Sequence, residues 1–262
     1  MTQPIAFARL PGPPAVVQAI ANAAQRTGVD FSYLMANARA ESGLDPMARA
    51  RTSSASGLFQ FTDATWLATV ARHGEKHGLG WAADAVKGGA AGAVRQTILS
   101  LRHDAGAAAA MAGEFTRDNA ARLEGALGRA ASAADLYMAA FFGAGGAIKF
   151  LKSMAAAPGA AAASLLPAAA AANRSTFYHA DGSARSLAQV HDLVSGRINR
   201  HIGGNLMPPA NAAEFSLLSA AAAGNPLPPT GSGLPYMRAP LPDPALVAAR
   251  ARMAYLVLAA MQ

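Results

Sequence analysis

Apolar residues recur at helical spacing along most of this chain, and that periodicity limits the fold more than any other feature. The clearest stripe has members at i, i+3, i+4 and i+7, namely Phe31, Leu34, Met35 and Ala38. Alanine supplies much of the 52% hydrophobic fraction. Its small side chain and high helix propensity favour closely packed helices over a sheet of β-branched residues. The sequence therefore predicts an all-α protein.

Local signals predict where several helices begin and end. We expect Pro13 and Pro14 to open a first helix that ends near Gly28, and Asp30 to cap the second. Thr62 or Asp63 is expected to cap a third. Further helical patterns cover about 91–113, 119–128, 133–142 and 187–202, and a glycine-rich run at 143–146 interrupts the helical pattern before Ile148.

The chain divides into four parts on these patterns. Residues 13–155 form the main helical domain, and residues 156–202 form a helical extension that packs on it. Residues 203–243, rich in Pro and Gly, are predicted to be a linker. Residues 244–262 are predicted to form a C-terminal amphipathic helix, which either packs back on the domain or docks on a partner protein.

Charge and composition narrow the partner classes. A net charge of +7 and a pI of about 10.2 favour an anionic partner such as nucleic acid, a membrane surface or the bacterial cell wall. The basic residues are scattered and match no nucleic-acid motif, so nucleic acid is not expected. No uncharged apolar run has the length of a membrane span, and residues 1–14 do not form a conventional secretory signal. The chain has no cysteine, hence no disulfide or thiolate metal site.

Glu41 extends the apolar stripe of residues 31–38 by three positions, just before Ser42 and Gly43 end the helix. An acidic residue on a core-facing stripe should lie at the rim or floor of a cavity. Because burial disfavours the charged form, we predict a raised pKa for Glu41, as a general acid near neutral pH needs. The alternative is an ordinary solvated glutamate at a helix end.

Three segments in order surround this residue: Glu-Ser-Gly-Leu-Asp-Pro at 41–46, Gly-Leu-Phe-Gln-Phe at 57–61 and Leu-Tyr-Met-Ala-Ala-Phe-Phe-Gly at 136–143. Together they resemble the three motifs of soluble lytic transglycosylases, which share the goose-type lysozyme fold, over about residues 15–155. The resemblance implies a lysozyme-like helical domain that cleaves the β-1,4 bond between N-acetylmuramic acid and N-acetylglucosamine in peptidoglycan. The product is a 1,6-anhydro sugar, and no cofactor is implied.

The resemblance implies that Glu41 is the single catalytic acid and base. Gln60 aligns with a glutamine that points into the cleft, with a buried structural amide as the alternative. Tyr137 aligns with a tyrosine near the acid, with a core tyrosine as the alternative. Asp45 is expected in a turn and Asp63 at a helix cap, so neither is assigned as a second carboxylate.

Other residues complete the expected site. Substrate contacts are assigned to Ser54, Ser56, Phe59 and Tyr178, and structural roles to Ser42 and Gly57. The chain departs from the family pattern in three ways. Met138 stands where the third motif usually has Asn, Phe59 replaces a common methionine, and the loop between the first two motifs is one residue longer. The longer loop leaves open which of Ser53, Ser54 and Ser56 lines the cleft.

Two aromatic and two histidine residues have ordinary explanations. Trp66 and Trp81 could stack on sugar rings, but the helical position of Trp66 favours the core. His73 and His77 have the i, i+4 spacing of metal ligands. The sequence places no acid or third ligand beside them, so no metal site is expected.

Three functions stay open at this stage. The first is a lytic transglycosylase, which Glu41 and Gln60 favour. The second is a non-catalytic peptidoglycan-binding or assembly module, and the third is a hydrolytic muramidase. Peptidoglycan strands are the expected partner, and the C-terminal region could dock on a flagellar or secretion apparatus. The expected location is the periplasm or cell wall, reached without a conventional signal peptide.

Overall fold

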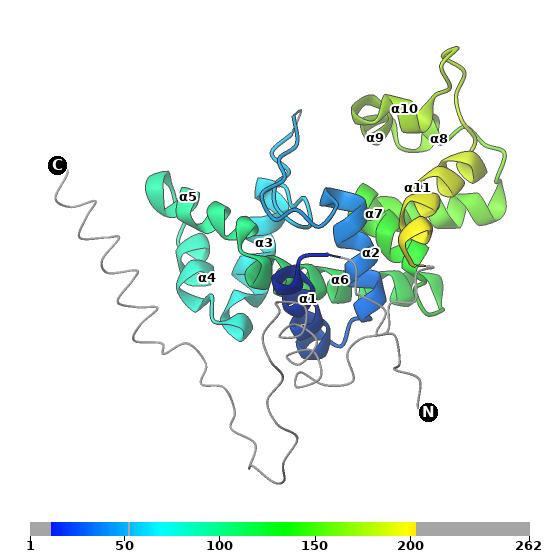
Figure 1. Cartoon of the computed structure of the whole chain (residues 1–262). Helices are drawn as coiled ribbons and strands as arrows, with labels where there is room; N and C mark the ends of the chain where they lie inside the picture. The colour runs from blue at the N-terminus through cyan, green and yellow to red at the C-terminus, as the bar shows by residue number, and fades with distance from the viewer. Residues whose placement is uncertain (1–11, 52, 203–262) are drawn as a thin grey trace, which may run out of the picture. The chain divides into compact units, whose positions relative to one another are not determined.

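The computed structural model describes residues 12–51 and 53–202, which are mostly helical (Figure 1). These residues contain no β-strand, only four isolated bridges, which confirms the predicted all-α class. In chain order the helices are α1 (Pro14–Thr27), α2 (Phe31–Ser42), α3 (Asp63–His73), η1 (Gly74–His77), α4 (Gly80–Lys87), α5 (Gly92–Ser100), η2 (Leu101–His103), α6 (Ala105–Leu127), α7 (Ala133–Ala156), α8 (Ala162–Leu165), α9 (Pro167–Ala172), α10 (Arg174–Phe177) and α11 (Leu187–Ile202).

The predicted linker at 203–243 and the predicted helix at 244–262 lie outside the described residues. Among the described helices, none combines the length and the apolar composition needed to span a bilayer.

The first two helices begin and end where the sequence predicts. Pro14 occupies the first turn of α1, and Gly28 ends it. The Asp30 side chain accepts a hydrogen bond of 2.9 Å from the backbone N–H of Tyr33, which caps α2. Gly43 ends α2 in the left-handed conformation, with φ of 63°. This ending leaves Glu41 in the last turn of α2, next to the loop that leads to α3.

Helix α6 lies at the centre of the core, where α1, α3 and α7 pack against it. Its buried side chains are mostly small, and they include the alanines at 108, 109, 110 and 112. One close approach is at Gly113, where an added Cβ would lie 2.5 Å from Oγ1 of Thr27 in α1. Small residues therefore allow α1 and α6 to pack closely, as the alanine content predicted.

The predicted boundaries around α5 and α6 are wrong. A single helix was expected at 91–113 and another at 119–128, but the chain turns at η2, and α6 then runs without a break to Leu127. Asp104 makes the new boundary, because its side chain accepts a hydrogen bond of 2.8 Å from the N–H of Ala107. Helix α4 was not predicted.

Helix α7 contains the predicted glycine interruption. Gly143 has φ of 72° and ψ of 155°, which no helical residue adopts, so α7 consists of two helical segments on either side of it. Phe142, the residue just before the kink, packs on Phe150 and Phe177, with ring centroids 5.5 and 5.7 Å away. These rings attach α10 to α7.

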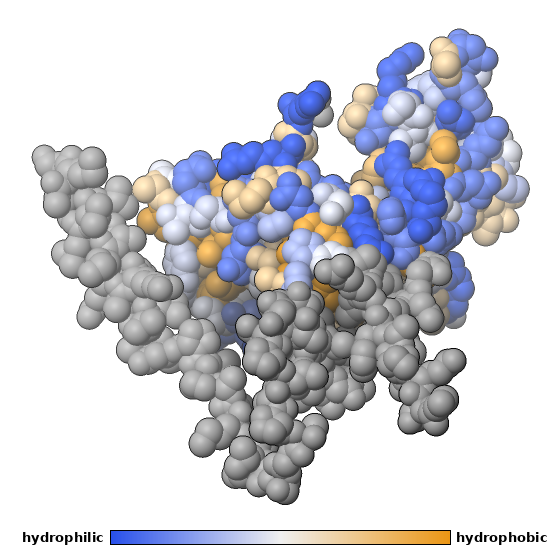
Figure 2. Space-filling view, in the orientation of Figure 1, coloured by the Kyte–Doolittle hydropathy of each residue, from blue (hydrophilic) through white to orange (hydrophobic). Residues whose placement is uncertain are grey.

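Helix α11 packs against both α2 and α7. One face of it is buried and carries Leu187, Val190, Val194 and Ile198. The alanine-rich stretch before it forms the short helices α8 and α9. On the visible face of the molecule, hydrophilic residues cover the loop that rises between α2 and α3 (Figure 2).

Candidate active site

Glu41 is partly buried in the last turn of α2. Burial raises the pKa of its carboxyl group above the usual value, which confirms the direction expected from its place on the apolar stripe. A hydrogen bond from Tyr137 and the positive charge of Arg197 lower that pKa and offset part of the effect. The site therefore favours the protonated form of Glu41 more than bulk water does. It also stabilises the carboxylate once the proton has left.

Tyr137, from the first segment of α7, is 3% exposed. Its hydroxyl donates a hydrogen bond to the Glu41 carboxylate. Burial raises the pKa of the Tyr137 hydroxyl, and the charge of Glu41 raises it further. Tyr137 therefore stays a neutral phenol and a hydrogen-bond donor to Glu41.

Arg197, from α11, is a member of the site that the sequence analysis missed. Its side chain is hydrogen-bonded to Tyr137, and its charge lowers the pKa of both Tyr137 and Glu41. Two further contacts hold the guanidinium in place. Nη2 donates to Oγ1 of Thr176 at 3.2 Å, and the group lies 5.2 Å from the centroid of the Phe141 ring.

Tyr33 is a second buried tyrosine near the acid, about two turns before it in α2. It is 4% exposed, and its hydroxyl is hydrogen-bonded to Thr116 of α6. Burial raises the pKa of Tyr33, and the charges of Tyr137 and Glu41 add to that effect. Helices α2, α7 and α11 thus bring two tyrosines and one arginine around a single carboxyl group.

Ser42 joins the end of α2 to the second motif. Its Oγ lies 3.0 Å from the carbonyl oxygen of Ala38 and 2.8 Å from that of Leu58, so the hydroxyl can donate to either. The second contact fixes the loop against the helix turn that carries Glu41.

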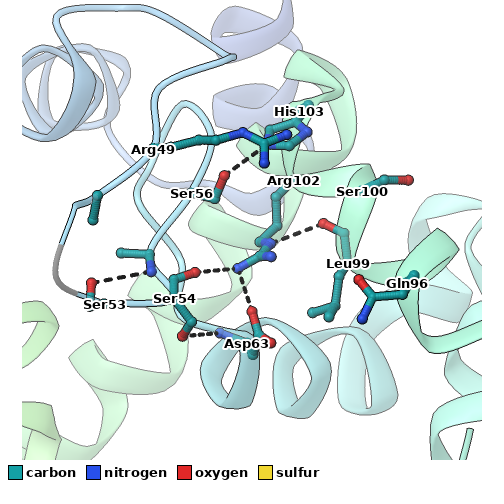
Figure 3. Close-up of a pocket in the computed structure, with 12 residues that line it drawn as sticks. Arg49, Ser53, Ser54, Ser56, Asp63, Gln96, Leu99, Ser100, Arg102 and His103 are labelled. Carbon is teal, nitrogen blue, oxygen red and sulfur yellow. Dashed lines mark hydrogen bonds and ion pairs between the residues drawn. The ribbon is translucent and has the colours of Figure 1, made fainter. Parts of the chain in front are cut away.

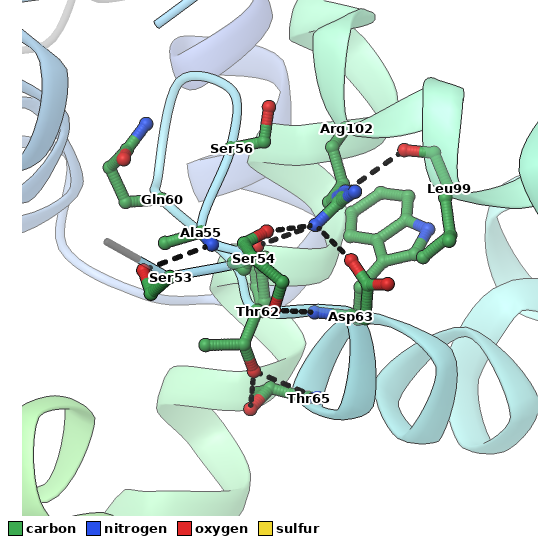
Figure 4. A network of polar contacts seen from close by, with 12 residues as sticks. Ser53, Ser54, Ala55, Ser56, Gln60, Thr62, Asp63, Thr65, Leu99 and Arg102 are labelled. Atoms are coloured by element: carbon green, nitrogen blue, oxygen red, sulfur yellow. Dashed lines mark hydrogen bonds and ion pairs between the residues drawn. The ribbon is translucent and has the colours of Figure 1, made fainter. Parts of the chain in front are cut away.

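Gln60 holds its own loop together. Its Nε2 donates to the carbonyl oxygens of Gly57 at 2.8 Å and Ala48 at 3.2 Å, as in the structural-amide alternative. Its backbone φ of 48° is unusual for a residue with a side chain. Among the described residues, Oε1 of Gln60 has no hydrogen-bond partner. Gln60 points away from the polar network around Arg102 (Figure 4).

Gly57 occupies a position that no other residue fits. Its φ is 81°, and an added Cβ would lie 2.1 Å from the carbonyl oxygen of Arg102. The close approach brings the loop of the second motif against η2.

Ser54 and Ser56 line a pocket whose wall contains neither Glu41 nor Tyr137 (Figure 3). Ser53 lines the same pocket. The three serines therefore share a pocket that the acid does not line, and their contact with substrate stays a prediction.

Phe59 and Tyr178 were expected to contact substrate. Phe59 is 7% exposed and belongs to the hydrophobic core, so its ring offers little surface to a sugar. Tyr178 is partly exposed, and the guanidinium of Arg174 lies 4.9 Å from the centroid of its ring. Trp66 is fully buried, as predicted, and its indole N–H donates to the carbonyl oxygen of Ile98 at 2.7 Å.

The two aspartates near the acid have other partners. Asp45 accepts a hydrogen bond of 2.8 Å from the N–H of Met47, as a turn residue does. Asp63 is not the cap of α3, because the Thr62 side chain caps that helix. Asp63 forms ion pairs with Arg102 at 2.9 Å and Arg95 at 3.4 Å instead. Within the described part of the chain, no other carboxylate contributes to the shifted pKa of Glu41.

The two histidines at metal-ligand spacing have acidic partners that the sequence analysis missed. Glu114 lies 2.9 Å from Nε2 of His77 and 3.5 Å from Nδ1 of His73, and Asp118 lies 3.0 Å from Nε2 of His73. Both acids come from α6, which faces α3 and η1. Across residues 12–51 and 53–202, no group of three such side chains is arranged as a metal site.

Residues 18–91 match the family model of the transglycosylase SLT domain. The matched segment contains Glu41, Ser42 and Gln60, while Tyr137 and Arg197 lie beyond it. The match agrees with the motifs at 41–46 and 57–61 and with the all-α architecture. The match therefore supports the soluble lytic transglycosylase family for this segment, and the all-α structure is consistent with a lysozyme-like SLT fold.

Proposed function

We propose that this protein is a lytic transglycosylase that cleaves the β-1,4 bond between N-acetylmuramic acid and N-acetylglucosamine and forms 1,6-anhydro-N-acetylmuramic acid. SLT domains act in general as peptidoglycan lytic transglycosylases. One observation carries the finer proposal. Glu41 is a partly buried carboxyl group whose pKa is raised by burial. Among the described residues, a tyrosine and an arginine lower that pKa, and no second carboxylate shifts it.

The chemistry needs one proton donor that later becomes a proton acceptor. Glu41 donates its proton to the glycosidic oxygen as the bond from C1 to that oxygen breaks. The C6 hydroxyl oxygen of the muramic acid then bonds to C1, and Glu41 takes the proton that this hydroxyl loses. Glu41 is protonated again at the end, so no water is consumed.

The neighbours of Glu41 fit both halves of this cycle. Burial favours the neutral acid that begins the reaction. The carboxylate formed in the first half accepts the hydrogen bond of Tyr137 and lies in the field of Arg197. Most glycosidases use two carboxylates, whereas Asp45 is held in a turn and Asp63 in ion pairs with two arginines, which favours the transglycosylase over the hydrolytic muramidase.

The test is mass spectrometry of the products released from purified peptidoglycan by wild type and by Glu41→Gln. Anhydro-muropeptides from wild type alone would support the proposal. Reducing-end products that the variant loses would mean a muramidase that uses water. No product from either protein, with wall binding retained, would favour the non-catalytic binding or assembly module.

We also propose that the protein acts at the wall, in the periplasm or cell-wall compartment, as its SLT domain suggests. The docking of residues 203–262 on a flagellar or secretion apparatus stays a prediction. Deleting these residues should leave the cleavage of purified peptidoglycan intact and abolish co-purification with that apparatus. Recovery of the full chain only from the cytoplasm of intact cells would overturn the location.

A further inference from the structure

A separate pocket of about 390 Å³ lies between the loop that follows α2 and the segment from α5 to η2 (Figure 3). We call it the Arg102 pocket. Polar side chains form most of its wall, and those used below are Arg49, Ser54, Ser56, Asp63, Arg102 and His103. None of them has a role in the acid chemistry described above.

Arg102 is a fixed cation at the wall of this pocket, with only 8% of its surface exposed. Its Nε donates to the carbonyl oxygen of Leu99 at 2.9 Å. Its Nη1 lies 2.8 Å from the carbonyl oxygen of Ser54 and 2.9 Å from Oδ1 of Asp63 (Figure 4). Nη2 has no acceptor among the described residues. The guanidinium is therefore held rigidly, with one nitrogen left for a ligand.

The pocket carries an excess of positive charge. Arg49 is exposed and has no ion pair within the described residues, and in Figure 3 its guanidinium lies beside His103. Asp63 is the one carboxylate of the wall, and Arg95 shares it with Arg102. A concave pocket with an excess of positive charge raises the local concentration of anions.

The positive charge of the pocket affects the pKa of His103. Burial lowers the pKa of its imidazole, and the charges of Arg49 and Arg102 lower it further. The ring stays neutral near pH 7 and forms a hydrogen bond of 2.7 Å with Oγ of Ser56. An anion bound beside Arg49 would cancel part of the field that keeps the proton away.

We propose that the Arg102 pocket binds an anionic group of the substrate, a carboxylate on the peptide stem of a peptidoglycan strand. The choice of a stem carboxylate rests on the proposed function, whereas the anion site rests on Arg49, Arg102 and His103. Guanidinium groups bind carboxylate and phosphate alike through paired N–H donors, so the experiment must distinguish these two sources.

The loop links this pocket to the SLT motif. The carbonyl oxygen of Ala48 accepts from Oγ of Ser56 at 3.3 Å and from Nε2 of Gln60 at 3.2 Å. Ser56 faces the pocket, whereas Gln60 belongs to the motif that Ser42 ties to the turn of Glu41. A strand that follows this loop could therefore place its sugars near the motif and a stem in the pocket.

The test measures binding without cleavage. Full-length Glu41→Gln protein is titrated with a disaccharide–tetrapeptide, with the same compound after its carboxylates are amidated, and with inorganic phosphate. NMR of the histidine ring follows His103. We expect the free-acid compound to bind and to raise the pKa of His103, so that affinity increases as pH falls through that pKa. The amidated compound should bind at least about tenfold more weakly.

Two variants test the assignment. Arg49→Gln should weaken binding of the free-acid compound about tenfold and have little effect on the amidated one. Arg51→Gln removes the same charge from an exposed position outside the pocket wall, and it should change affinity by less than about twofold. Because Arg49 and Arg51 are both exposed, neither change should impair folding.

Equal binding of the free-acid and amidated compounds would overturn the proposal, and so would equal effects of the two arginine variants. Phosphate that binds as tightly as the tetrapeptide and depends on Arg49 would overturn the stem assignment in favour of a phosphate-bearing polymer. Stem binding without any cleavage by wild type would reject the lytic function alone. Cleavage without carboxylate-dependent binding would reject the pocket assignment alone.

Discussion

The hydroxyl of Tyr137 donates to the carboxylate of Glu41, although α3, α4, α5 and α6 separate their two helices in the chain. The hydrogen bond lowers the pKa of Glu41 while burial raises it, so the two effects together set the pH range in which the acid holds its proton. This balance can be altered one partner at a time.

Tyr137→Phe removes the hydrogen bond and keeps the ring in the core. Because the carboxylate loses a donor, the pKa of Glu41 should rise further. The alkaline limb of the pH–rate profile should move to higher pH, and the maximal rate should fall roughly tenfold. Carbon NMR of the Glu41 carboxyl group gives the pKa directly. Tyr178→Phe is the control, since Tyr178 contacts Arg174, and an equal shift in both variants would contradict the assignment.

Arg197→Met removes the charge that helps the carboxylate of Glu41 and keeps an aliphatic chain of similar length. We again expect a higher pKa for Glu41 and an alkaline limb at higher pH. Arg197→Lys keeps the charge and should leave the limb closer to that of wild type, although the contact with Thr176 changes. A limb that moves equally in both variants would mean that packing of α11, and not its charge, governs the acid.

Glu41→Gln should lower the rate of anhydro-product release by at least about 10²-fold, the usual contribution of a general acid. It should also stabilise the fold at pH 7. The native pKa lies above the unfolded value, so wild type loses stability as pH rises from the unfolded pKa of about 4.5 to the native pKa. Glutamine carries no charge to bury. Thermal melts at pH 4 and pH 7 should show a gain for the variant that is present at pH 7 and small at pH 4.

Glu114→Gln should destabilise the protein at pH 7 by about 1–3 kcal/mol, because a buried carboxylate between two histidines becomes neutral. Burial alone would raise the pKa of Glu114, but the His77 hydrogen bond, followed by the charges of His73, Lys76 and Arg117, holds it below the usual value. This contribution is present above the unfolded pKa of about 4.5 and is lost as pH falls through the native pKa.

Urea unfolding at pH 7 and at low pH measures this effect, and the difference between Glu114→Gln and wild type should shrink at low pH. Exposed Glu75 in η1 provides the control, and Glu75→Gln should change the free energy of unfolding by less than about 0.5 kcal/mol. A loss that is the same at both pH values would show that the carboxylate charge is not responsible.

Gly57→Ala should disrupt the loop of the second motif, because the new methyl group would overlap the carbonyl of Arg102 at a positive φ. We expect a loss of several kcal/mol of stability, or failure to fold. Gly128→Ala has a similar φ of 68° with open space around it, and it should cost only about 1–2 kcal/mol. Similar melting temperatures for the two variants would rule out the steric explanation.

The features that could be predicted from the sequence depend on interactions between residues close together in the chain. The ends of α1 and α2, the caps at Asp30 and Thr62, and the break at Gly143 depend on residues that are neighbours in the chain. The place of Glu41 follows from the same kind of pattern, since its helix phase alone puts it beside the core.

Contacts between distant segments could not be predicted in this way. Arg197 borders the apolar stripe of α11, but nothing local shows that α11 packs on α2. The acids beside His73 and His77 come from another helix, and Ser54 and Ser56 face a pocket completed by α5 and η2. Predicting each of these contacts requires knowing which helix packs against which.

The packing of α11 on α2 and α7 also sets the smallest fragment worth expressing. A fragment cut at residues 18 and 91 would keep the acid and lose the tyrosine and arginine that adjust it. Grafting residues 18–91 onto another scaffold would therefore transfer Glu41 without Tyr137 and Arg197, the side chains that shift its pKa. The transferable unit runs at least from α1 to the end of α11.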